Sequence, residues 1–418
     1  MPRFFRPQVL EAFHLTNTAL GDAFAVYGVT AMLAYFPGGL LADRFPARGL
    51  LAASLAATAA GGLYFATQPG PTGLTILYGY WGITTILLLW GAMIRATREW
   101  GGRLQQGRAF GLLDGGRGLV AAVLSSLALL LLRGGSLRGV ILFYTAVTAA
   151  SAVLCWFAVP ASSPVAAAGG TAAAGTAAAS TRATDASAAG AAAGRWWPSR
   201  TVWWQAAIVV CAYCGYKGLD YYALMASQTL GLSALEAAEW FSATAYLRPV
   251  AAIAAGWIAD RHGAHNGAHN GVSRTVSGLF ALGLAGYALL AGVGSTATLW
   301  WAANLLLTIV AVYALRGVYF ALLEETRVDA ARTGMAVGII SLVGYAPDAF
   351  FAPIAGRLLD AAPGVAGFRL LCGLLAVIFA LGAVAAARLG AVAAVRLGAE
   401  ASVRLRAEAA ARLGRDSN

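Results

Sequence analysis

Long apolar segments separated by short polar stretches run through most of the chain. A helix needs roughly 20 apolar residues to cross the hydrocarbon core of a bilayer. By that measure the pattern predicts an all-α polytopic membrane protein with eleven spans. They lie near residues 17–41, 49–67, 74–96, 109–132, 138–159, 201–225, 236–259, 274–295, 298–322, 334–359 and 366–388.

The apolar pattern is interrupted once by a different composition. Residues 161–194 are almost pure Ala, Gly, Ser and Thr, with too few bulky side chains to fold, so 161–200 is predicted to be a flexible linker. It separates an N-terminal helical bundle, 1–160, from a C-terminal bundle, 201–388. The basic tail, 389–418, repeats Arg-Leu every eight residues. It is either a helix lying on the anionic inner leaflet or a solvated low-complexity segment.

Composition agrees with a membrane protein. Hydrophobic residues make up 59% of the chain, charged residues 11%, and the mean hydropathy is +0.69, which leaves too little charge to cover a soluble domain. The net charge of +11 comes from 28 Arg and one Lys, gathered mostly between the apolar segments as the positive-inside rule arranges them. We therefore expect a lipid bilayer around the protein and no nucleic acid partner.

The four cysteines all lie within apolar segments. The spacing of Cys211 and Cys214 would suit a redox or zinc pair, but no second Cys or His pair stands at zinc spacing. We interpret them as packed thiols, and we expect neither a metal nor a cofactor.

Two short repeats indicate that the chain consists of two homologous halves. The phrases Gly39-Leu-Leu-Ala-Asp43-Arg44 and Gly256-Trp-Ile-Ala-Asp260-Arg261 each end an apolar segment, 217 residues apart, and their glycines are expected to let the helices pack closely. A second pair begins a segment in each half, 227 residues apart: Gly107-x-Ala-x-Gly111 and Gly334-x-Ala-x-Gly338. Small residues four apart allow close helix approach in lipid, so these are expected at the boundary between the halves.

The Asp-Arg phrases resemble the loop signature of the major facilitator superfamily, G-x-L-A-D-R-x-G-R-R, which follows the second and eighth helices of that fold. The second copy matches only through Arg261, and the first carries Pro46 and Ala47 where the signature has Gly and Arg. The resemblance implies two pseudo-symmetric helical bundles and secondary transport by alternating access. It also implies a gating role, rather than substrate binding, for the motif residues Gly39, Asp43, Arg44, Gly256, Asp260 and Arg261.

One helix of the superfamily pattern is not found, because only one span precedes Arg44 where the pattern has two. Either the start codon is assigned too late, which we favour, or this is an eleven-span variant. With the Asp-Arg loops inside, most arginines between spans also fall inside. We therefore expect a monomer in the bacterial cytoplasmic membrane with the linker and tail cytoplasmic. Arg3 and Arg6 fall outside, against this trend.

Charged residues within spans are the candidate functional residues, since lipid tolerates them only where they face a cavity or a partner. Arg248 lies ~18 Å and Arg117 ~15 Å along their helices from the inner surface, close to the middle of the membrane. They are predicted to converge on an anionic substrate group, which a planar guanidinium binds through two parallel hydrogen bonds. The alternative is a structural ion pair, for example between Arg117 and Asp114.

The chain's single lysine, Lys217, is predicted to contact the substrate together with Tyr216 and Tyr221. The alternative is that Lys217 only neutralises Asp220, which lies three residues further along the same helix.

Asp348 and Asp22 are the predicted proton carriers, because burial in a low dielectric favours the protonated acid. Pairing of Asp348 with an arginine is the competing interpretation. Arg316 is expected in the inner half of its span. A cytoplasmic salt-bridge network is expected among Glu324, Glu325, Arg327 and Arg332, with a counterpart among Arg95, Arg98 and Glu99.

These residues predict a transporter of a small organic anion (a carboxylate, phosphate ester or sulfonate), coupled to protons, and not an enzyme. The chain is similar to bacterial nitrate/nitrite porters and anion symporters, but the Asn-containing glycine-rich runs typical of nitrate transport are missing. No G-x-x-x-x-G-K-[ST] loop occurs, so an ion gradient is expected to drive transport. The alternatives are an exporter of cationic or hydrophobic compounds, using Asp22 or Asp348, and a membrane-embedded transferase, which lacks the expected His-Asp or acidic cluster.

Overall fold

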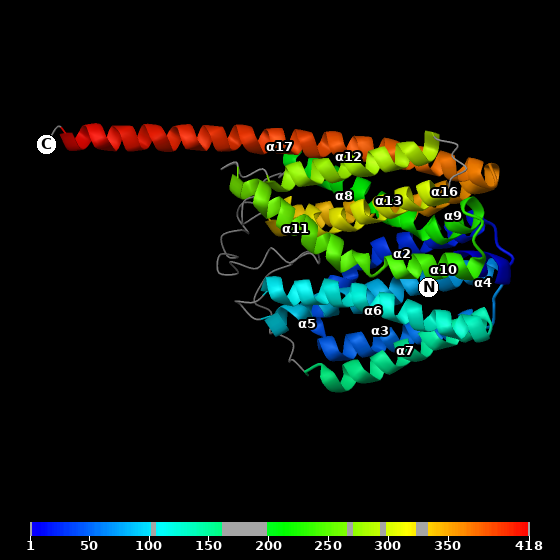
Figure 1. Ribbon diagram of the computed structural model, residues 1–418. Helices are drawn as coiled ribbons and strands as arrows, with labels where there is room; N and C mark the ends of the chain where they lie inside the picture. The colour runs from blue at the N-terminus through cyan, green and yellow to red at the C-terminus, as the bar shows by residue number, and fades with distance from the viewer. Residues whose placement is uncertain are drawn as a thin grey trace.

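The computed structural model describes residues 2–101, 106–160, 199–265, 271–292, 298–322 and 333–416, and these form helices joined by short turns (Figure 1). The first half contains α1 (Arg6–Ala12), α2 (Asn17–Arg44), α3 (Ala47–Phe65), α4 (Pro71–Ile83), η1 (Thr84–Trp90), α5 (Gly91–Gly101), α6 (Gln106–Gly134) and α7 (Leu137–Ala158). The second half contains α8 (Arg200–Gly218), η3 (Leu219–Tyr221), α9 (Tyr222–Thr229), α10 (Ala234–Thr244), α11 (Leu247–His265), α12 (Gly271–Gly292), α13 (Thr298–Val318), η4 (Tyr319–Ala321), α15 (Thr333–Gly344), α16 (Pro347–Ala361) and α17 (Val365–Asp416).

Each of the eleven predicted spans is helical, which confirms the all-α polytopic fold class. Within the described ranges, eight helices are both long and apolar enough to cross a membrane. The segments predicted at 49–67, 201–225 and 236–259 are helical but are not among the eight. The last two are interrupted, since α8 ends at Gly218 and α10 ends at Thr244.

Several spans change their winding in mid-course, and the sequence explains some of these breaks. Pro249 and Pro347 lie in the first turns of α11 and α16, where proline is tolerated, and each ends the helix before it. The span that begins with α4 continues as the π-helix η1, where the hydroxyls of Thr84 and Thr85 bond back to the carbonyl of Trp81. Irregular backbone at membrane depth is typical of a binding region.

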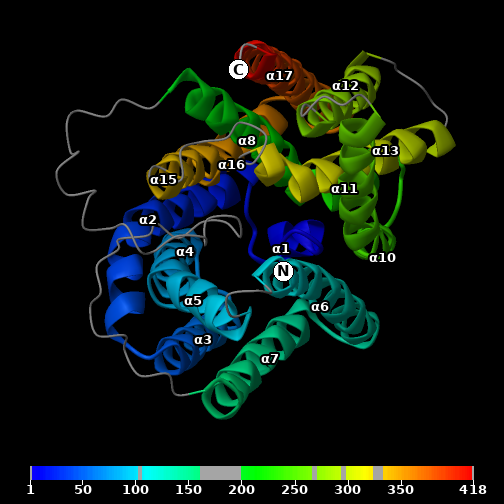
Figure 2. The same cartoon turned by 90° about the vertical axis from the view of Figure 1, so that its left-hand side faces the viewer.

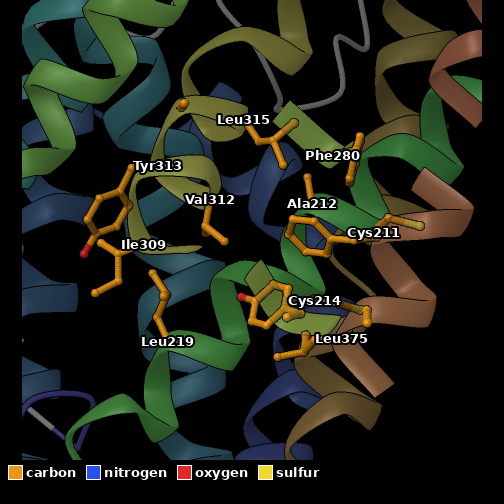
Figure 3. Close-up of a cluster of buried hydrophobic side chains, with 14 of the residues drawn as sticks. Cys211, Ala212, Cys214, Leu219, Phe280, Ile309, Val312, Tyr313, Leu315 and Leu375 are labelled. Carbon is orange, nitrogen blue, oxygen red and sulfur yellow. The ribbon is translucent and has the colours of Figure 1, made fainter. Parts of the chain in front are cut away.

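The two halves form two bundles side by side (Figure 2). In the first, α2 packs on α4 and α3 on α7; in the second, α12 and α8 pack on α17, and α11 packs on α13. The second bundle holds the largest apolar core, which α8, α12, α13 and α17 build together (Figure 3). Cys211 and Cys214 lie in this core as free thiols, which is the packed arrangement that the sequence predicts.

The bundles meet along two seams, α2 against α16 and α6 against α10 and α11. We call the end of the bundle where α2 and α11 finish the motif end, and the opposite end the far end. At the α2–α16 seam the backbones touch, since a Cβ added to Gly21 or Gly28 would collide with the backbone of Ala352 or Asp348. Only glycine permits this approach, so the seam depends on these two positions.

Polar contacts reinforce both seams toward the far end. Asp360 accepts hydrogen bonds from the backbone N–H groups of Asn17 and Thr18 at the start of α2, at 3.1 and 2.7 Å. On the other seam, the Arg133 guanidinium pairs with Glu239 at 2.7 Å. The halves are therefore held together from the far end to the middle of the bundle.

The glycines of the Asp-Arg repeats correct one expectation. A Cβ at Gly39 or Gly256 would meet nothing within 4 Å, so neither glycine packs closely against a neighbour in this conformation. The side chains of the second repeat, from Gly107 and Gly334, lie outside the described ones. Among the glycines whose surroundings are described, close packing falls on positions outside the Asp-Arg repeats, because it is set by which helix lies opposite.

The tail continues the last span without a break, as α17 runs for 52 residues and extends well beyond the other helices (Figure 1). The boundary predicted at residue 388 is therefore not a helix end, and the tail continues the axis of the span rather than turning onto a membrane surface. The predicted linker, 161–200, lies almost wholly outside the described residues, between α7 and α8.

Topology gives the first testable prediction. α7 is a single 22-residue span, so Gly135 before it and Gly175 after it should lie on opposite sides of the membrane. Fusions of alkaline phosphatase and of green fluorescent protein at each position should give opposite signals, with Gly175 cytoplasmic. Equal signals at both positions would contradict the arrangement.

The seam gives a second prediction. Gly28→Ala should force α2 and α16 apart and cost about 1–3 kcal/mol, as overpacking does. We expect a lower melting temperature for the detergent-purified protein and reduced transport. The matched control is Gly278→Ala, also within a helix, where a Cβ meets nothing within 4 Å. If both variants melt alike, the α2–α16 contact does not determine stability.

Candidate functional site

A cluster of charged side chains lies where the broken helices meet in the middle of the bundle. Its centre is Lys217, near the end of α8, whose ammonium Nζ stands 3.1 Å from Asp348 Oδ1 and 3.4 Å from Asp220 Oδ2. The Lys217 and Asp220 side chains are about nine-tenths buried. One cation is therefore shared between two carboxylates, one on its own span and one on α16.

The local winding brings these groups together. Asp220 lies in the 3₁₀ turn η3, three residues after Lys217, so the two side chains share a face. Asp348 lies in the first turn of α16, where unpaired backbone N–H groups and the helix dipole favour a carboxylate. The Tyr213 hydroxyl donates to the same carboxylate, at 3.0 and 3.1 Å from its two oxygens.

Asp220 has a second cationic partner. The Arg3 guanidinium donates to Asp220 Oδ1 and also to the carbonyl oxygen of Tyr216, the latter at 3.2 Å. Both members of this ion pair are largely buried. The Arg3 side chain thus reaches the middle of the bundle.

Tyr216 lies between two arginines. The guanidinium carbons of Arg3 and Arg316 are 3.9 and 4.0 Å from the centroid of its ring. The Tyr216 ring therefore contacts both guanidinium groups. Arg316 also stands 5.6 Å from the Tyr213 ring. In the part of the chain that the structure describes, Arg316 Nη1 is buried and has no hydrogen-bond partner.

These residues form what we call the central cluster. It contains three cations and two carboxylates, held with tyrosines on α8: Arg3, Tyr213, Tyr216, Lys217, Asp220, Arg316 and Asp348. Arg316 differs from the other two cations of the cluster, because tyrosine rings rather than a carboxylate of the cluster lie beside it.

Aromatic residues of α2 face the central cluster from the first half. The Phe24 ring lies 5.2 Å from Lys217 Nζ, and Tyr27 bonds Thr85 on η1 at 3.2 Å. Phe24 and Tyr27 also line a cavity of about 310 Å³ between α2, α3, α4 and α7. Further walls of this cavity come from Trp81 and Thr145. It is therefore an apolar space with a few hydroxyls, beside the charged groups.

Arg248 lies at the α6–α11 seam, close to the position of Arg117 on α6, and the convergence of their guanidinium groups on an anion stays a prediction. The Arg248 side chain passes Gly118, whose Cβ would lie 3.4 Å from Arg248 Cδ. Arg117 is the residue before that glycine, and its guanidinium lies 5.7 Å from the Trp90 ring. Both arginines act electrostatically on tyrosines near the central cluster, Arg248 on Tyr216 and Arg117 on Tyr27.

Two predicted site residues lie apart from the central cluster. Tyr221 is buried, its hydroxyl donates to the carbonyl of Ala352 at 3.1 Å, and its ring packs under Arg6. Asp22 forms an ion pair with Arg357 at 2.8 Å, across the α2–α16 seam, with both side chains about half exposed. Asp22 therefore joins the two bundles near the far end.

The motif end is described in part. Asp260 and Arg261 are exposed at the end of α11, whereas the side chain of Asp43 lies outside those described. Arg95 pairs with Glu99 at 2.7 Å and donates to the carbonyl of Ala42, which bears out the pairing expected there in the first half. The network expected at residues 324–332 lies outside the described residues.

Sequence reasoning missed Arg316 and Tyr213 as site residues. Arg316 carries a usable signal, an arginine inside an apolar span, but its distance from the Glu pair assigned it to the inner half of that span. Tyr213 carries none, since its contact with Asp348 joins helices 135 residues apart in the chain.

Comparisons with known proteins agree with this arrangement. A sequence model described as Major Facilitator Superfamily matches residues 3–352. Inner membrane protein YihN of Escherichia coli is 25% identical over 394 residues, covering 91% of this chain and 88% of YihN. Inner membrane protein YqcE of Escherichia coli is 26% identical over 363 residues, covering 85% and 81%.

Solved structures share the fold. A bacterial homolog of the human lysosomal transporter Spinster, in an inward-facing and occupied conformation, superposes with a TM-score of 0.62 at 12% identity, covering 93% of this chain and 94% of that one. The nucleoside transporter NupG superposes with a TM-score of 0.65 at 13% identity, covering 93% and 98%.

Proposed function

Because the chain belongs to the Major Facilitator Superfamily and is a multi-pass membrane transporter, we propose that it carries a small organic anion across the bacterial cytoplasmic membrane by alternating access. The substrate would be a carboxylate, a phosphate ester or a sulfonate. The central cluster and the adjoining cavity would receive it.

The observation that supports an anion most directly is Arg316. Among the described residues, tyrosine rings rather than a carboxylate lie beside its charge, and Nη1 has no hydrogen-bond partner. A guanidinium suits carboxylate, phosphate and sulfonate oxygens because it donates two parallel hydrogen bonds. Arg248 and Arg117 add positive charge from the neighbouring seam. The cavity beside the cluster, about 310 Å³, has room for the body of a small organic molecule.

Asp348 is the proposed proton carrier. Its carboxylate lies in mid-bundle, at the break between α15 and α16, and its backbone faces Gly28 across the seam between the halves. Protonation there would alter a group that touches both the central cluster and the moving boundary. Asp22 is the weaker candidate because Arg357 already neutralises it at 2.8 Å.

The proposed membrane orientation puts the motif end in the cytoplasm. The contacts between the halves then close the outer side, from the Asp360 bonds at the start of α2 to Gly28 in mid-bundle. Opening outward would break the ion pairs Asp22–Arg357 and Arg133–Glu239. The Asp-Arg motifs would act in that outward-open state by tying the inner helix ends together.

The export of cationic compounds is the rival function. It would need a buried acid that is free to pair with the drug, but Asp220 and Asp348 are both engaged by cations. An anion transporter needs no free buried acid, so the anion proposal agrees better with these ion pairs.

The arginines give a direct test in proteoliposomes, using counterflow of labelled succinate, glycerol 3-phosphate and ethanesulfonate. At least one should exchange through the unaltered protein. Arg248→Lys and Arg316→Lys keep the charge but lose the planar fork, so affinity should fall about ten-fold or more, as the loss of a charge-assisted hydrogen bond predicts.

The control is Arg138→Ala, which removes an exposed arginine at the start of α7 and should leave exchange unchanged. Normal affinity in both lysine variants would exclude these arginines as anchors. Exchange of an organic cation in place of all three anions would favour the rival function.

Proton coupling has its own test. Asp348→Asn removes the group that would titrate, so it should still permit counterflow yet abolish accumulation driven by a pH gradient. Both are measured in the same proteoliposomes, with and without an imposed gradient. Gradient-driven accumulation at the unaltered rate would show that Asp348 does not carry the proton.

A further inference from the structure

We infer that Lys217 is exchanged between Asp348 and the transported anion, so that proton binding at Asp348 creates the anion site. This inference rests on the proposed function and assigns the coupling to one residue pair. Lys217 is the natural choice because it is the one cation of the central cluster that bridges two spans through two carboxylates.

The geometry supplies the exchange. Lys217 Nζ is closer to Asp348, at 3.1 Å, than to Asp220, at 3.4 Å, and Asp220 has Arg3 as a second cation. If Asp348 lost its charge, Arg3 would still neutralise Asp220. The Lys217 ammonium would then lack a carboxylate of its own. A buried ammonium is strongly disfavoured without an anionic partner. An incoming carboxylate, phosphate or sulfonate oxygen can supply that partner.

Every element packed around Asp348 contributes to this balance. α8 supplies Lys217 and the Tyr213 hydroxyl, which both contact Asp348. η3 supplies Asp220, which pairs with the same lysine. α2 supplies Tyr27 and Tyr35, which lie within electrostatic range of the Asp348 carboxylate. α13 supplies Arg316, which interacts electrostatically with Tyr213. α15 supplies Tyr345, whose ring packs edge-on against Tyr213. Around Asp348, the described charged side chains are thus cationic apart from Asp220, and the others are phenols.

The step is balanced in charge. A proton from solution adds to the Asp348 carboxylate, and Lys217 stays a protonated ammonium throughout. One negative charge is lost at Asp348 and one arrives on the anion, so the cluster keeps its net charge. Release of the anion restores the Lys217–Asp348 pair and returns the proton. Proton and anion binding are then reciprocally linked, each raising the affinity for the other.

The test measures the dissociation constants of succinate, glycerol 3-phosphate and ethanesulfonate by titration calorimetry, on the full-length protein in nanodiscs, between pH 5.5 and pH 8.5. Each constant is expressed for the fully ionised ligand, because succinate and glycerol 3-phosphate themselves gain a proton toward the lower pH. For one linked proton, affinity should fall by up to about ten-fold per pH unit as pH rises across this range. Asp348→Asn releases Lys217 permanently, so it should bind at pH 8.5 within about three-fold of the unaltered protein at pH 5.5.

Two further variants separate the exchange from a merely structural role. Lys217→Met combined with Asp348→Asn removes both charges of the pair and avoids a buried unpaired carboxylate at Asp348. It should fold, and it should bind the anion about ten-fold more weakly than Asp348→Asn alone, without pH dependence. Glu239→Gln alters an acid on the other seam, paired with Arg133, and should keep the full pH dependence.

The outcomes are distinct. Tight anion binding that does not vary with pH in the unaltered protein would overturn the exchange while leaving the anion proposal intact. Equal affinity of Asp348→Asn and the double variant would also overturn it, because Lys217 would then make no contact with the anion. Failure of all three anions to bind any variant, Asp348→Asn included, would overturn the proposed function and the exchange together.

Discussion

The structure depends on the need to keep charge paired in the middle of an apolar bundle. Lys217 meets that need through two carboxylates, and Asp220 meets it through Lys217 and Arg3. Asp220 lies in a 3₁₀ turn, and Asp348 lies at a helix start that Pro347 creates. The breaks in the spans thus lie at the residues that form the central cluster.

The same constraint ties chemistry to motion. Asp348 contributes its side chain to Lys217 and its backbone to the contact with Gly28, so one residue belongs both to the central cluster and to the seam. The α2–α16 seam cannot adapt to a larger residue there, because the opposing atoms are backbone. A change in the charge of Asp348 therefore occurs on a residue that itself forms the contact surface between the bundles.

Much of the fold could be predicted from sequence because the signals are local. Apolar length located the spans, whereas the breaks before Pro249 and Pro347 inside two of them were not predicted. The Lys217–Asp220 pair was readable from its three-residue spacing. Contacts between helices were not readable, since the face that a helix presents depends on its neighbour. Arg316 against Tyr216 and Gly28 against Asp348 are such contacts, and for the same reason the repeated glycines Gly39 and Gly256 proved to have open space around them.

The two arginines on Tyr216 show how one ring can hold cations for different purposes. Arg3 is neutralised by Asp220, so its charge is already compensated by an ion-pair partner. Among the described residues, Arg316 has aromatic rings rather than a carboxylate beside it, and these lower the cost of burying its charge without cancelling its field. A cation in a fixed ion pair has little to gain from a further anion. A cation held by aromatic rings has more to gain, which is why Arg316 rather than Arg3 is the stronger candidate for contact with a charged ligand.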